Sequence, residues 1–154
     1  MSARRLARSI ALVCTTLLFG CGDSLGPGDV AGTYVLQRVA GDALPTLLYT
    51  TEFVKIRVFA DTLRFKIDGR GSISTFRESE PVKGDGPSEP FRWQTGFSYR
   101  VVEDRIEVTF DCPPNASCVK GPHILLREAR AGLVADFALG ARLPLQYRLV
   151  SRAN

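Results

Sequence analysis

Few side chains in this chain of 154 residues could perform catalysis. Nucleophilic and general acid–base mechanisms need a titratable base held beside a nucleophile or an acid. His123 is the only histidine, and although it could pair with Asp111 or a serine, nothing in the spacing places them together. The sequence also lacks a nucleophile elbow, paired carboxylates at catalytic spacing and a phosphate-binding glycine loop. We therefore expect a protein that is not an enzyme and that uses no metal or cofactor.

The four cysteines, Cys14, Cys21, Cys112 and Cys118, do not form the paired motifs of a metal site. The last two are six positions apart in the segment CPPNASC, whose adjacent prolines favour a bend that can bring them together. Disulfides form in exported proteins, and the leader described next predicts export. We expect a Cys112–Cys118 disulfide that mainly fixes the shape of its loop.

The first 20 residues have the layout of a secretory signal peptide. Three arginines precede an apolar core at residues 10–19, which is shorter than the roughly 20 residues that a membrane-spanning helix needs. The core ends in LFGC at positions 18–21. This ending resembles the lipobox of bacterial lipoproteins, in which a small residue precedes the cleavage point and a cysteine follows it. The resemblance implies that residues 1–20 are removed, that Cys21 receives a diacylglycerol thioether, and that the new amine can be acylated.

A lipid anchor places the protein on a membrane of the cell envelope. Gly22, where an aspartate would argue for inner-membrane retention in enteric bacteria, favours the periplasmic side of the outer membrane. Residues 21–29 follow as the lipidated cysteine and a tether rich in Gly, Pro, Asp and Ser, with a reach of at most about 30 Å. Removing the three leader arginines leaves 17 Lys and Arg against 16 Asp and Glu, so the charge gives no support for nucleic-acid binding.

The rest of the chain, residues 30–154, is dominated by alternating apolar and polar side chains, which predict strands with one buried face. In residues 91–110 two alternating runs joined by Glu103-Asp104 predict a hairpin. Residues 53–67 predict two strands or one sharply bent strand, with Ala60 on the face of Val58. Other strands are expected at 32–39, 72–78 and 145–150, turns at 41–42 and 68–71, and long loops at 79–90 and 111–122. Residues 123–139 fit either a helix or a hairpin, and Gly132 near the middle favours the hairpin.

Eight or nine short strands at hairpin spacing are typical of a closed barrel or a sandwich. The first strand carries Gly32-Thr33-Tyr34, followed by Leu44-Pro45, and this resembles the opening of bacterial lipocalin-like domains. The resemblance implies an all-β, up-and-down antiparallel barrel of about eight strands with one open end. It also implies that Tyr34 takes the place of the lipocalin tryptophan and that Arg148, on the last strand, packs over it at the closed end.

Large apolar and aromatic side chains gather on the expected inner faces. They either line a pocket for a small apolar ligand or simply fill the core, and the sequence leaves both interpretations open. They are Phe65, Trp93, Phe97, Tyr99, Ile106, Val108, Phe110, Phe137 and Tyr147. The alternative function is a protein–protein interaction module of the envelope that acts through loop 79–90 or the disulfide loop.

Overall fold

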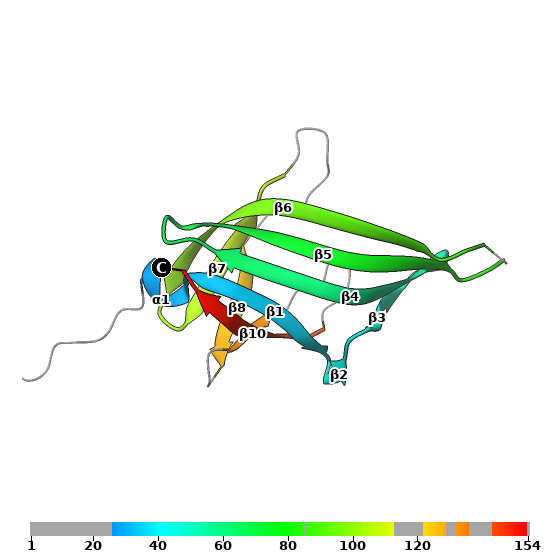
Figure 1. Ribbon diagram of the computed structural model, residues 1–154, viewed down its shortest axis with the longest axis horizontal. Helices are drawn as coiled ribbons and strands as arrows, with labels where there is room; N and C mark the ends of the chain where they lie inside the picture. The colour runs from blue at the N-terminus through cyan, green and yellow to red at the C-terminus, as the bar shows by residue number, and fades with distance from the viewer. Residues whose placement is uncertain (1–25, 85, 113–121, 129–131, 136–142, 154) are drawn as a thin grey trace, which may run out of the picture.

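The computed structural model describes residues 26–84, 86–112, 122–128, 132–135 and 143–153. These residues form strands almost throughout, with a single helical turn at their start (Figure 1). The elements are α1 (Pro27–Val30), β1 (Gly32–Val39), β2 (Asp42–Ala43), β3 (Thr46–Thr50), β4 (Val54–Phe65), β5 (Arg70–Pro81), β6 (Glu89–Val102), β7 (Arg105–Phe110), β8 (His123–Glu128), β9 (Gly132–Ala135) and β10 (Leu145–Arg152). No helix in these described segments is long and apolar enough to cross a membrane.

Eight of the strands form a closed antiparallel barrel. Each strand from β4 to β10 pairs with the next along the chain, and β1 closes the ring by pairing with β10 on one side and β4 on the other. The short strands β2 and β3 are additions that pair with β1 and β4. The predicted all-β, up-and-down barrel of about eight strands is therefore confirmed.

One end of the barrel is covered by α1, beside which the chain also ends (Figure 1). The Tyr34 hydroxyl donates to the carbonyl oxygen of Val30 at 3.0 Å, and the Tyr99 hydroxyl lies 2.5 Å from the carbonyl oxygen of Lys66 and 3.2 Å from that of Pro27. Val30 is buried in the core. The expected flexible tether is thus too long at its C-terminal end, because residues 27–29 belong to this helical turn.

Residues 54–65 form one continuous strand, β4. Its pairing with β5 changes register once, between Val58 and Ala60. Val58 pairs with Arg77 and Ala60 pairs with Phe76, so Phe59 is an extra residue between them. An extra residue reverses which side chains face inward. Ala60 is consequently exposed, contrary to expectation, while Asp61 is buried.

The hairpins differ from the expected ones mainly in length. β5 ends at Pro81 and β6 begins at Glu89. The long loop expected at 79–90 is therefore shorter and comprises residues 82–88. The first turn lies at Ala40-Gly41 rather than at 41–42, with both residues at positive φ. β3 was not expected as a strand.

The last third of the chain contains strands and not a helix in its described parts. β8 and β9 pair as a hairpin from Leu125 opposite Ala135 to Glu128 opposite Gly132, which confirms the strand interpretation for those residues. On β8, Leu125 is buried in the core and Leu126 is exposed.

Aromatic rings fill the half of the barrel nearest α1. The ring of Phe65 lies 5.6 Å from that of Tyr34, 5.2 Å from that of Phe97 and 4.9 Å from that of Tyr99, between centroids. Such edge-to-face and tilted pairs stabilise the core beyond their buried area. Gly71 on β5 lies between Phe65 and Phe97 in the sheet, where its lack of a side chain leaves room for the rings.

Replacing Gly71 with alanine is expected to lower the free energy of unfolding by about 2 kcal/mol, because extra atoms in a packed core force it apart. The added Cβ would overlap the Phe97 ring and lie 2.5 Å from the backbone oxygen of Arg64. Urea denaturation gives the value. Gly28→Ala is the control, since a Cβ there meets nothing within 4 Å, and a loss of equal size in both variants would contradict the account.

Candidate functional site

Most of the side chains that could either line a pocket or fill the core belong to a packed core. Six of them are buried: Phe65, Phe97, Tyr99, Ile106, Val108 and Tyr147. Trp93 and Phe110 are only partly buried and pack against the edge of that core. Phe137 lies outside the described residues. Most of these side chains therefore fill the core rather than line a pocket.

A small cavity lies inside the barrel, on the side of the aromatic core away from α1. Its volume is about 10 Å³, close to the minimum that a water molecule needs. The side chains around it come from five strands, β4, β5, β6, β7 and β10. They are Asp61, Ile73, Arg77, Trp93, Phe110, Leu145 and Tyr147.

Charged and polar side chains form an unusual share of this lining. Asp61 is 4% exposed and Arg77 is 5% exposed, although such residues are almost never fully buried unless they are paired. Arg77 donates from Nε to Thr75 Oγ1 at 3.0 Å. Thr75 pairs with Asp61 on one side and with Trp93 on the other, so these three residues form one layer across β4, β5 and β6. We name Asp61, Thr75, Arg77 and Tyr147 the lumen cluster.

Two atoms of the lumen cluster have unused hydrogen-bonding capacity. Asp61 Oδ1 and the Tyr147 hydroxyl are both buried, and neither makes a hydrogen bond of good geometry within the described residues, although the two groups are close enough to shift each other's pKa. Among the described residues, no ion pair joins Arg77 to a carboxylate. An unsatisfied buried polar group costs roughly 1–3 kcal/mol, so proteins usually satisfy such groups with water or a ligand.

The surroundings of Asp61 shift its acidity into the physiological range. Burial raises its pKa from 3.8 to about 7, against the smaller opposing effects of the Arg77 charge and the nearby Tyr147 hydroxyl. Burial and the Asp61 charge hold the pKa of Tyr147 well above its ordinary value, so this phenol stays protonated. The lumen cluster therefore holds one permanent positive charge, a neutral phenol, and a carboxyl that gains or loses its proton near neutral pH.

No protein-family model, curated protein or solved structure matches this chain. A guanidinium, a protonatable carboxyl and a phenol around a small space, with an indole beside them, suit the binding of a small polar group. These groups come from residues that sequence patterning did not single out, apart from Trp93 and Tyr147.

The expected pair at the closed end is not brought together. Tyr34 is buried, whereas Arg148 is exposed on the face of β10 opposite Tyr147. Arg152 lies at this end, with its Nη1 3.4 Å from the carbonyl oxygen of Asp29. Burial raises the pKa of Tyr34, and the charges of Arg127 and Arg152 partly oppose that effect.

The remaining candidate residues are placed as follows. His123 is partly buried with its ring 5.2 Å from that of Phe110, and burial lowers its pKa, which favours the neutral imidazole at neutral pH. Cys112 lies two residues after the end of β7. Cys21 and Cys118 lie outside the described residues, so the lipidation and the disulfide stay predictions.

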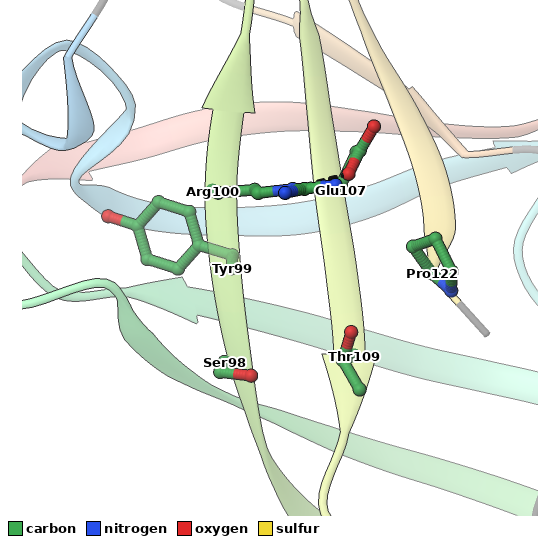
Figure 2. A pocket seen from close by; sticks show the side chains of 6 residues that line it. All are labelled: Ser98, Tyr99, Arg100, Glu107, Thr109 and Pro122. Atoms are coloured by element: carbon green, nitrogen blue, oxygen red, sulfur yellow. Dashed lines mark hydrogen bonds and ion pairs between the residues drawn. The ribbon is translucent and has the colours of Figure 1, made fainter. Parts of the chain in front are cut away.

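A second hollow lies on the outer surface, over β6, β7 and the start of β8, with a volume of about 260 Å³. Figure 2 shows Arg100 and Glu107 reaching toward each other across the two strands, with Ser98 and Thr109 farther along and Pro122 beside them. Arg100 Nε donates to Glu107 Oε2 at 2.6 Å. The charges of Arg100 and Glu107 are thus already paired, and the Arg100 side chain is largely exposed. This hollow is therefore a weaker candidate for a binding site than the lumen cluster.

Proposed function

We propose that this protein is a lipid-anchored envelope protein whose barrel binds a small molecule in its lumen. The observation that carries the proposal is the lumen cluster, where buried polar atoms that lack good hydrogen bonds within the described residues line a cavity in an otherwise apolar interior. A purely structural core has no need of Asp61 and Arg77 at these positions, because apolar residues there would cost less to bury. The small apolar ligand expected from the sequence is thus narrowed to one that also carries a polar group.

The position of the proposed anchor defines how the barrel faces the membrane. Cys21 precedes α1 by only six residues, a reach of about 20 Å at most. Because α1 covers one end of the barrel, an acylated Cys21 would keep that closed end toward the bilayer. The opposite end, which lies nearer the lumen cluster, would then face the aqueous compartment, and ligand would enter from there.

Native and denaturing mass spectrometry of the full chain, purified from membranes in a mild detergent, tests this proposal. We expect the denatured mass to show acylation at Cys21, and the native mass to exceed it by a bound small molecule. Arg77→Gln should reduce that extra mass, whereas Arg100→Gln, which changes an exposed arginine on the outer face, should retain it.

Two results would count against lumen binding. Native protein with no added mass in repeated preparations would favour a barrel filled by its own side chains. A second protein retained in place of a small molecule would favour the alternative, an interaction module of the envelope. Unacylated Cys21 would remove the anchor from the proposal without bearing on the lumen.

A further inference from the structure

Arg77 is a buried cation in need of a negative partner. Only 5% of the residue is exposed, and its one hydrogen bond among the described residues uses Nε and Thr75 Oγ1. No hydrogen bond of the two terminal guanidinium nitrogens is found among the described residues, and Arg77 is one of the side chains that line the cavity. A buried charge without a counter-charge is costly, and guanidinium groups bind carboxylates through their paired N–H groups.

The described residues do not supply a full counter-charge to Arg77. Asp61 is the acidic residue of the lumen cluster, but it makes no ion pair with Arg77. Its burial also favours the protonated carboxyl at and below about neutral pH. A protonated Asp61 is a hydrogen-bond donor and has no charge to offer Arg77.

The other described residues that line the cavity do not change this balance. Tyr147 on β10 is a neutral donor, and Trp93 on β6 and Phe110 on β7 carry no charge. His123 on β8, which contacts Phe110, is shifted toward its neutral form. The lumen therefore presents a guanidinium, a phenol and a protonated carboxyl, which are all donors around one small space.

We infer that the lumen ligand is a small amphipathic carboxylate whose head is held by Arg77 and Tyr147 while Asp61 carries a proton. This inference rests on the proposed function and names the ligand class for the same site. The carboxylate takes the place of the water-sized cavity, and its apolar remainder lies along Trp93 and Leu145 toward the end of the barrel opposite α1. Because the cavity itself is no larger than a water molecule, side chains above it move apart to admit that remainder.

Binding of such an anion is linked to a proton. When Asp61 is ionised in the free protein, ligand binding takes up one proton from solution at its carboxyl. Affinity is then highest below about pH 7 and falls as Asp61 ionises. From the Asp61 pKa of about 7, affinity should weaken by about 30-fold between about pH 6 and pH 8.5.

Three probes with the same alkyl chain test the inference: octanoate, octanol and octylammonium, each added to the full chain in a neutral glycoside detergent. Trp93 is the only tryptophan in the chain and lines the cavity, so its fluorescence reports binding there. We expect octanoate to bind best, with the fall in affinity given above, because octanoate stays ionised throughout that range. Octanol should bind more weakly and without pH dependence. Calorimetry in two buffers of different ionisation enthalpy should show uptake of about one proton per octanoate above pH 8.

Matched variants separate the roles of the two charged residues. Arg77→Gln should weaken octanoate binding at least about tenfold and leave octanol unchanged, because the lost bond is charge-assisted. Asp61→Asn should retain octanoate binding, because the amide still donates, and should abolish its pH dependence. If either variant fails to fold, proton uptake by the unmodified protein still decides the question.

Each outcome bears on a definite statement. Equal or better binding of octanol or octylammonium, or octanoate binding without proton uptake, would overturn the carboxylate inference and leave lumen binding intact. If none of the probes binds but native mass spectrometry finds a retained molecule, the ligand class is wrong and the proposed function stands. If no probe binds and no molecule is retained, both fail.

Discussion

Phe97→Ala is expected to lower the free energy of unfolding by about 4 kcal/mol, because it removes a large ring from a closely packed interior. Phe97 is 0% exposed. Its ring centroid lies 5.2 Å from that of Phe65 and 5.8 Å from that of Phe110, so it joins the aromatic core to the edge of the lumen cavity. The void left by alanine cannot collapse easily, since the surrounding strands are fixed in a closed ring.

Urea denaturation of both proteins, monitored by circular dichroism, measures this loss. Phe91→Ala on the same strand is the matched control, because Phe91 is 40% exposed and its truncation should cost less than about 1 kcal/mol. Similar losses for the two variants would mean that Phe97 is not in a packed core.

Asp61→Asn is expected to stabilise the protein at about pH 8 by up to about 4 kcal/mol. Burial raises the pKa of Asp61 from 3.8 to about 7, so the folded protein holds this proton more tightly than the unfolded chain does. The folded form therefore loses stability as pH rises from about 4 to about 7, at up to about 1.4 kcal/mol per pH unit, and the loss is complete above that range. Asparagine cannot ionise and escapes the loss.

The measurement is the free energy of unfolding of both proteins at several pH values between about 4 and 8. The difference between them should be near zero at the acid end and should grow toward neutral pH. Asp104→Asn, in the exposed turn between β6 and β7, is the control and should show little dependence on pH. A constant difference between the Asp61 variant and the unmodified protein would show that Asp61 is ionised in the fold throughout.

Local patterning predicts the hairpins of this barrel well. The hairpin of β6 and β7 is visible in the sequence because both strands alternate cleanly and Glu103-Asp104 interrupts them. Closure of the ring is different, since it depends on Gly32–Val35 pairing with residues about 30 positions away in β4. The resemblance to lipocalin-like domains implies a closed ring, but local patterning does not predict it, because closure depends on long-range packing.

The lumen cluster could not be predicted in the same way. Alternation places Val58 and Leu63 on inner faces, and their odd separation of five positions requires a change of phase somewhere between them. In the structure, a bulge at Phe59 supplies this change of phase and turns Asp61 inward. A break at Asp61-Thr62, with Asp61 in a turn, would fit the same sequence pattern. Arg77 shares the parity of Ile73 on β5, but a charged residue in a polar strand is ordinarily assigned to the solvent face.

The covering of the closed end by α1 could not be predicted either, for a related reason. The composition of residues 22–29 is that of a linker, and nothing within it indicates that Pro27 and Val30 meet two tyrosines. Both tyrosines belong to the alternating inner faces, but their hydroxyl groups need partners at the end of the barrel. α1 supplies those partners through backbone carbonyl oxygens.

The ¹³C NMR titration of the Asp61 side-chain carboxyl tests the central claim most directly, with its signal assigned by its absence in Asp61→Asn. The account predicts a midpoint at about pH 7 in the free protein, and a higher midpoint once octanoate is bound. A midpoint near the ordinary aspartate value of about 4, unchanged by octanoate, would show that Asp61 is solvated and would contradict a buried lumen cluster as the binding site.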